Sequence, residues 1–150
     1  MNIQENLKPT GMVTVSHFNS EGELINSFEV PNLVVTSGKQ YIASRIKDTT
    51  YGAMTYMAIG TSSTAASATD IILVSEGGRV ALSATTVSTN TITYTATFPA
   101  GTGTSTSPGV QEAGIFNGSS GGTMLCRTVF PSVAKAAGDS IAITWVVTVS

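Results

Sequence analysis

The chain has 150 residues and a mass of 15.4 kDa, the usual size of one domain. Hydrophobic residues make up 41% and are spread along its length, so the chain can bury a core and is not of the low-hydrophobicity, high-charge type that stays disordered. Seven basic and nine acidic residues give a net charge of −2, too few Lys and Arg for a basic patch, so we expect no nucleic-acid partner.

The first ten residues, MNIQENLKPT, carry neither the basic start nor the apolar core of a secretory signal, and no run approaches the roughly 18 apolar residues of a membrane span. We therefore expect a chain made in the cytoplasm, with no membrane partner. Residues 1–10 are interpreted as an N-terminal arm, in which Ile3, Leu7 and Pro9 are candidate interface residues for a neighbouring subunit. A frayed terminus is the alternative.

Two β-strands are predicted next. Gly11–Phe18 and Leu24–Val30 flank a polar turn at 19–23, an arrangement typical of a hairpin. Pro31 ends the second strand because it lacks an amide donor. A short β segment at 33–35 follows.

One short amphipathic helix is predicted from Gly38 to Lys47. Ser37 and Gln40 have the spacing of a capping box, in which the two side chains satisfy free amides at a helix start. The residues that follow at helical spacing are Tyr41, Ile42, Arg45 and Ile46.

The next segments are a strand at Met54–Ile59 and a low-complexity loop at Thr61–Thr69. Asp70 is predicted to cap a helical turn through Val74.

The clearest periodicity lies in Thr91–Phe98, where threonines alternate with apolar residues as in a half-buried antiparallel strand. The β-rich run Arg79–Val87 precedes it, so the two predict a hairpin with its turn at Ser88–Asn90.

The C-terminal third contains a further hairpin. Val110–Asn117 and Thr123–Phe130 flank the segment 118–122, whose glycines permit the positive φ that a turn needs. Before it, Pro99–Gly109 is predicted to be an exposed flexible tip. After it, Ser140–Val149 is dense in β-branched residues and predicts a central strand.

Eight or nine short strands with a single helix predict a mainly β fold: a single-domain antiparallel β-sandwich over residues 11–150 with one short α-helix. A parallel α/β fold would need repeated alternation of strand and helix, which this sequence does not have.

Chemistry-bearing residues are few and scattered. His17 is the only histidine and Cys126 the only cysteine, and the sequence contains no serine-hydrolase elbow or metalloprotease motif. His17 is interpreted as structural, and Cys126 as a small core residue on one strand face with Met124 and Phe130. We therefore predict no enzyme and no catalytic, cofactor or metal site. The alternative is a small hydrolase that uses His17 or Glu112.

Charged residues amount to only 11%, against an average near 25%, whereas 18 Ser and 23 Thr supply 41 positions. Nine of the sixteen charges lie in the first fifty residues, and the stretches 49–69 and 80–111 contain none. Such an uncharged surface suits burial against other protein chains. A threonine-rich β surface that faces water is the competing interpretation.

Seven segments between residues 32 and 148 form a recognisable series in a consistent order: NLVVTSGKQYIASRI (32–46), YMAIGTSS (56–63), RVAL (79–82), ITYTATF (92–98), EAGIFN (112–117), MLCRTVF (124–130) and IAITWVVT (141–148). In these segments the chain resembles small virion structural proteins of tailed bacteriophages. The resemblance implies an assembly role and no catalytic residue, and it does not extend to the first thirty residues.

The function that follows is that of a non-enzymatic virion protein, assembled in the host cytoplasm. We favour a capsid decoration, or cement, protein that binds the major capsid protein or other virion subunits and stabilises the head, with the chain forming a homo-oligomer, expected to be a trimer. The alternative is a tail-fibre or baseplate component for host attachment. Its contact tips would be the loops 61–69 and 99–109, with Tyr51, Tyr56 or Phe116 as anchors.

Overall fold

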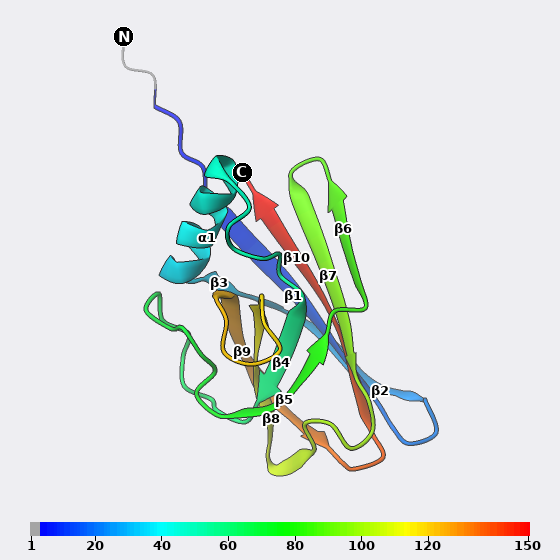
Figure 1. Cartoon of the computed structure of the whole chain (residues 1–150). Helices are drawn as coiled ribbons and strands as arrows, with labels where there is room; N and C mark the ends of the chain where they lie inside the picture. The colour runs from blue at the N-terminus through cyan, green and yellow to red at the C-terminus, as the bar shows by residue number, and fades with distance from the viewer. Residues whose placement is uncertain (1–3) are drawn as a thin grey trace.

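Two five-stranded antiparallel sheets pack face to face in a computed structural model that describes residues 4–150, with one helix at one end (Figure 1). The first sheet has the strand order β2-β1-β10-β7-β6 and the second has the order β3-β9-β8-β4-β5. The predicted antiparallel β-sandwich with one short helix is therefore confirmed.

The elements follow the chain with short connections except for the segment between β4 and β5. Their bounds are β1 (Pro9–Phe18), β2 (Leu24–Pro31), β3 (Leu33–Val34), α1 (Thr36–Lys47), β4 (Tyr56–Gly60), β5 (Glu76–Ala81), β6 (Ala84–Ser88), β7 (Thr91–Phe98), β8 (Ser105–Phe116), β9 (Met124–Lys135) and β10 (Ser140–Val149).

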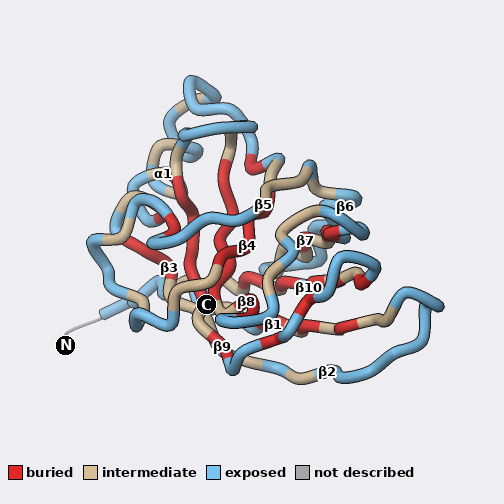
Figure 2. The backbone as a smooth tube through the Cα atoms, turned by 90° about the horizontal axis from the view of Figure 1, so that it is seen from below, coloured by how far each residue is buried: buried red, intermediate tan, exposed pale blue. Residues whose placement is uncertain are grey.

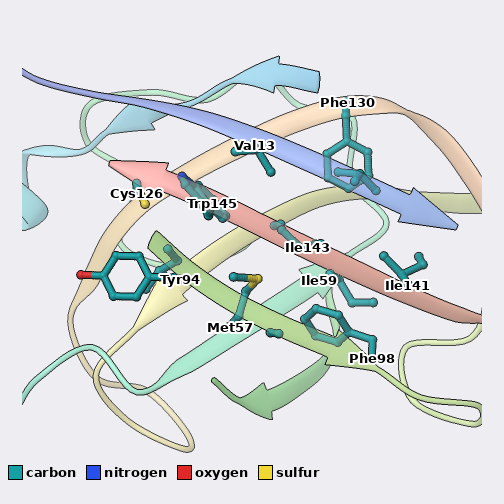
Figure 3. Packing of buried hydrophobic residues seen from close by; sticks show 14 of the residues in the cluster. Val13, Met57, Ile59, Tyr94, Phe98, Cys126, Phe130, Ile141, Ile143 and Trp145 are labelled. Atoms are coloured by element: carbon teal, nitrogen blue, oxygen red, sulfur yellow. The ribbon is translucent and has the colours of Figure 1, made fainter. Parts of the chain in front are cut away.

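The core lies between the sheets and is built by strands in which buried residues alternate with more exposed ones. In β10, which lies between β1 and β7 as predicted for a central strand, Ile141, Ile143, Trp145 and Val147 are buried and the residues between them are more exposed. The inner strands of both sheets are buried along their middles, whereas the edge strands β2 and β6 are largely exposed (Figure 2). Close-up, the buried residues of both sheets interdigitate (Figure 3).

Of the three predicted hairpins, two form as expected and the third is divided between the sheets. The hairpins β1–β2 and β8–β9 form as expected. The run Arg79–Val87, however, is not one strand: its first part ends β5 in the second sheet, and its last part lies in β6 of the first sheet, next to β7. The chain crosses between sheets at Leu82 and Ser83, which a purely local alternation of residues could not reveal.

The helix begins two residues earlier than predicted, and its capping box is wrong. Val35 occupies the N-cap without a side-chain cap bond, and Ser37 Oγ instead donates to the carbonyl of Met124 at 2.9 Å. The helix start is thus attached to β9 by a tertiary contact. The strand predicted at Met54–Ile59 is also displaced and forms β4 at Tyr56–Gly60.

The predicted flexible tip at Pro99–Gly109 is shorter than expected. Strand β8 already begins at Ser105, and the second half of that segment is therefore part of the sheet. The prolines and glycines that predicted a loop are tolerated there because the register between β8 and β9 is irregular in this stretch.

A second irregularity separates Cys126 from Met124. Ile115 pairs with Cys126, but Phe116 pairs with Met124, so the pairing skips Leu125. Cys126 joins the core between the sheets, whereas Met124 packs on the opposite face of the second sheet. The prediction that the two share a strand face is therefore wrong, because an extra residue shifts the alternation by one.

The predicted arm of residues 1–10 is partly strand. Pro9 and Thr10 pair with Val149 and Thr148 at the start of β1, so they belong to the first sheet. Ile3 lies outside the described residues.

Gly38 lets α1 pack tightly on the second sheet, since an added Cβ would lie 1.9 Å from the carbonyl oxygen of Leu125. Alanine normally stabilises a helix by about 1 kcal/mol relative to glycine, but at this position the clash with Leu125 outweighs that gain. We expect Gly38→Ala to lower the free energy of unfolding by about 1–3 kcal/mol in urea titrations. Gly52→Ala, which meets open space, is the matched control and should be neutral or slightly stabilising. Equal stabilities for the two variants would contradict this packing.

Candidate functional site: an uncovered sheet face opposite a covered one

The outer face of the second sheet is covered by residues 61–75, here called the covering segment. It has no helix or strand of its own, yet its Leu73 is buried against the sheet. The residues that pack with Leu73 in a small second core are Val35, Ala58, Phe116, Met124 and, at its edge, Tyr56. The low-complexity segment predicted as a free loop is therefore held against the sheet.

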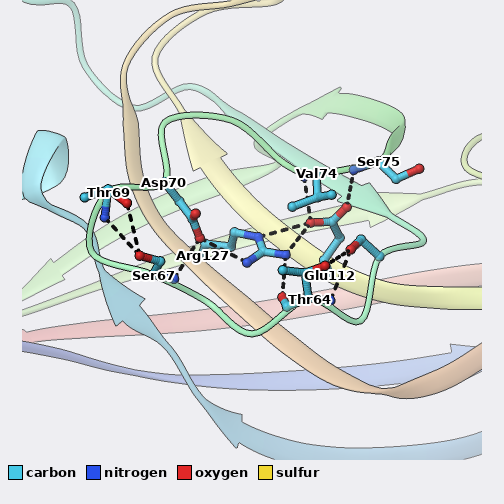
Figure 4. Close-up of polar contacts among 9 residues, drawn as sticks. Thr64, Ser67, Thr69, Asp70, Val74, Ser75, Glu112 and Arg127 are labelled. Atoms are coloured by element: carbon cyan, nitrogen blue, oxygen red, sulfur yellow. Dashed lines mark hydrogen bonds and ion pairs between the residues drawn. The ribbon is translucent and has the colours of Figure 1, made fainter.

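A buried ion cluster attaches the covering segment to the sheet (Figure 4). Arg127 of β9 donates to Glu112 of β8 through Nε at 3.1 Å and Nη2 at 2.9 Å, and both side chains are fully buried. The same guanidinium donates to the Asp70 carboxylate at 3.0 Å and to the Thr64 carbonyl at 2.9 Å.

Glu112 also holds the end of the covering segment. Its two carboxylate oxygens accept hydrogen bonds from the backbone amides of Val74 at 3.1 Å and Ser75 at 2.7 Å. Those amides have no strand partner, so the carboxylate supplies the acceptor that fixes this end of the segment. Asp70 does not cap a helical turn as predicted; it accepts from the Ser67 amide at 2.9 Å and pairs with Arg127.

Arg79 of β5 covers the rest of this outer face. Its guanidinium lies 3.9 Å from the centre of the Phe116 ring and pairs with Glu76 through Nη2 at 2.7 Å. Nη1 donates to the carbonyls of Gly118 and Gly121 in the β8–β9 turn. The cation therefore closes the second core and orders the turn at the same time.

The outer face of the first sheet is uncovered and has a regular composition. Its rows follow from the strand register: Thr14 lies beside Thr144 and then Thr95, and Met12 lies beside Val146 and then Thr93. Nine threonines share this surface, which we call the threonine face: Thr10, Thr14, Thr86, Thr91, Thr93, Thr95, Thr97, Thr144 and Thr148.

The threonine face is nearly free of charge. Among the paired positions of the described strands, Glu29 of β2, opposite Thr14, is the one charged residue on this side. The residues of the threonine face are exposed or half-buried, whereas Glu112 and Arg127 on the outer face of the second sheet are fully buried. Of the two uncharged stretches, 80–111 contributes β6 and β7 to this face, whereas 49–69 contributes β4 and most of the covering segment to the second sheet.

His17 is engaged at the end of the sandwich that holds the β1–β2 turn. Its Nε2 lies 2.9 Å from the Asp139 carboxylate, which also accepts from the Ala136 amide at 3.0 Å. The bond from His17, and next the bond from Ala136, lower the pKa of Asp139 below its usual value. Beside them the Lys135 ammonium donates to the carbonyls of Pro99 and Asp139, and burial lowers the pKa of Lys135. These groups tie three chain segments together.

Cys126 is fully buried in the core, and burial raises the pKa of its thiol. Its strand neighbours are Val34 and Ile115, while His17 bonds to Asp139, so these contacts give the thiol no activating base. Across residues 4–150, no three His, Cys, Asp or Glu side chains are grouped so that they could hold a metal ion. No helix within that range is long and apolar enough to cross a bilayer.

The predicted interface residues Leu7 and Pro9 meet at the opposite end of the molecule, beside α1. Leu7 is 71% exposed, and Pro9 is half-buried at the start of β1. Both line a groove of about 250 Å³ whose other wall contains Ile42 and Ile46 of the helix. The structure therefore brings two of the three candidates together on one apolar surface.

The aromatic anchors considered for host attachment differ in availability. Tyr51 is 51% exposed, but Phe116 is fully buried beneath the covering segment and Tyr56 is half-buried beside it. Phe116 is therefore not a surface anchor.

Sequence reasoning missed Arg127. Its position could have indicated a role, because a lone cation within the apolar strand MLCRTVF lies either at a sheet surface or in an interior ion pair. Which carboxylates it meets depends on how β8 and the covering segment lie in space. Those partners, Glu112 and Asp70, are 15 and 57 residues away in the chain.

Comparison with known proteins yields no relative: no family model, no curated protein and no solved structure matches this chain.

Removing Arg127 should detach the covering segment. Arg127→Met leaves the buried Glu112 carboxylate without its cation, so we expect the free energy of unfolding to fall by about 3–5 kcal/mol, with faster proteolytic cleavage within 61–75. Lys47→Met, at an ion pair whose lysine side chain is 83% exposed, is the control and should change stability by less than about 0.5 kcal/mol. A protease-resistant Arg127→Met protein of unchanged stability would contradict this role.

The His17–Asp139 contact predicts a pH dependence. Because the pKa of Asp139 is lowered on folding, its contribution to stability is complete above about pH 4 and is lost as the pH falls through the folded-state value. We expect unfolding titrations between pH 6 and pH 2 to show a smaller loss of stability for Asp139→Asn than for the unchanged protein. Glu29→Gln removes an exposed carboxylate without removing this bond and serves as the control. An Asp139→Asn curve parallel to that of the unchanged protein would count against the contact.

Proposed function

We propose that this protein is a non-enzymatic structural subunit of a tailed-phage virion, which decorates the head by laying its threonine face on the capsid protein. The observation that carries the proposal is the uncovered, nearly uncharged face formed by β2, β1, β10, β7 and β6. The sequence resemblance described above supplies the virion context.

The composition of the threonine face suits a permanent protein contact. Charged residues are depleted at the centres of protein interfaces, because each buried charge must be desolvated. On this face the central rows contain Thr, Val and Met, and Glu29 lies toward the edge on β2. The hydroxyls add hydrogen-bond donors and acceptors at a smaller desolvation cost than a charge.

The size of the face is also adequate. Five strands about 4.8 Å apart and about seven residues of ~3.4 Å each give a projected area near 600 Å². A standard-size interface buries about 800 Å² on each partner, so the face is of the same order of size.

The polar chemistry elsewhere in the molecule supports a structural role. Arg127, Glu112 and Asp70 are bonded to one another and to backbone, and His17 is bonded to Asp139. A decoration protein of this kind would act by mass action: it binds only the assembled shell, so each bound copy stabilises the shell relative to free subunits.

The location and number of copies in intact particles test the proposal. Labelled antibody and quantitative mass spectrometry of purified virions should find the chain on the head, in hundreds of copies rather than a handful. A chain found only at the tail would overturn head decoration and favour attachment to the host.

A matched pair of variants tests the face itself. Thr144→Arg places a cation at the centre of the threonine face, and we expect it to weaken binding to undecorated heads at least tenfold. Thr104→Arg introduces the same side chain in the β7–β8 connection and should bind normally. Equal binding by the two variants would exclude the threonine face as the contact.

A further inference from the structure

The exposed basic residues all lie at one end of the molecule. Of the seven Lys and Arg, Arg79, Arg127 and Lys135 are used in internal contacts. The other four are on α1 or beside it: Lys8, Lys39, Arg45 and Lys47. The same end carries two carboxylates, Glu5 and Asp48, the second of which pairs with Lys47 at 3.0 Å, so its net charge is positive.

An apolar groove opens at this basic end, here called the helix-end groove. Between α1 and the β6–β7 hairpin it has a volume of about 320 Å³ and is lined mainly by apolar groups, with Arg45 at its wall. It adjoins the smaller groove beside Leu7, because Ile42 and Val149 line both. Nearby, Ile46 is 83% and Val87 70% exposed. A continuous apolar patch of this kind marks an interaction site.

The β1–β2 turn, at the opposite end of the sandwich, has the complementary character (Figure 1). It carries Glu21 and Glu23, and directly after them Leu24 and Ile25, which are 58% and 55% exposed. The turn is preorganised, because the Asn19 side chain accepts hydrogen bonds from the amides of Glu21 and Glu23 at 2.9 Å each.

We propose that copies of this chain associate head to tail, with the β1–β2 turn of one copy seated in the helix-end groove of the next. Leu24 and Ile25 would enter the groove, whose volume of about 320 Å³ compares with the ~150 Å³ of a cavity that holds one benzene. Glu21 and Glu23 would face Lys8 and Lys39, which line the adjoining groove beside Leu7.

The charges favour this arrangement over a symmetric one. Two helix ends brought together would oppose their lysines, and two β1–β2 turns would oppose their glutamates, and each such like-charge contact is unfavourable. A head-to-tail contact uses two different surfaces on every copy, so repetition produces either a closed ring or an open chain. The inference concerns contacts between copies and does not depend on the proposed head decoration.

Charge reversal at the two surfaces provides the test, read by sedimentation velocity at low ionic strength. One variant carries Glu21→Lys and Glu23→Lys, and the other carries Lys8→Glu and Lys39→Glu; all four positions are exposed, and circular dichroism checks the fold. We expect each variant alone to associate at least tenfold more weakly than the unchanged chain. A one-to-one mixture of the two, or one chain with all four changes, should recover association because opposite charges again face each other.

Glu29→Lys is the matched control, since it reverses a charge on the same hairpin away from its turn, and it should associate normally. Raising the salt concentration toward 1 M, where the screening length is about 3 Å, should weaken association of the unchanged chain. A monomeric unchanged chain at high micromolar concentration, or a turn variant that assembles as well as the control, would overturn the inference. Thr144→Arg should leave this self-association intact, which separates the result from a failure of the threonine face.

Discussion

The Arg127–Glu112 ion pair is the contact on which the outer layer of the second sheet depends. Both side chains are fully buried, so each would be costly without the other. Glu112 also accepts two backbone amides from the covering segment, and Arg127 binds Asp70 and Thr64 of the same segment. A segment without helix or strand is thereby held in place, and its Leu73 completes a second core.

This cover makes the two sides of the sandwich unequal. The second sheet has a small apolar core on its outside, while the first sheet presents threonine rows to the surroundings. One face is therefore satisfied within the chain, and the other is available to a partner. The proposed decoration role uses this inequality, since a face whose centre is uncharged can be buried without leaving charges unpaired there.

The long axis of the sandwich carries a second asymmetry. Internal partners bind three of the seven cations, Arg79, Arg127 and Lys135, and the remaining four lie around α1. The glutamates of the β1–β2 turn lie at the other end of the sandwich. A net charge of −2 conceals this separation, because the sum contains no information on position. The face and the ends are distinct surfaces, so binding to a shell and association between copies could occur together.

The sequence by itself determined the mainly β class, the β8–β9 hairpin and the central place of β10, because local alternation and turn glycines act over a few residues. It also indicated an uncharged surface. Only the tertiary structure decided that Arg79–Val87 divides between two sheets, that Leu125 shifts the alternation of β9, and that residues 61–75 are held in place. The division of Arg79–Val87 and the place of residues 61–75 depend on partners far away in the chain, such as Arg127 for Asp70, and local patterns carry no information about such partners. The shift at Leu125 depends on how β9 pairs with β8, which a simple alternation of residues does not show.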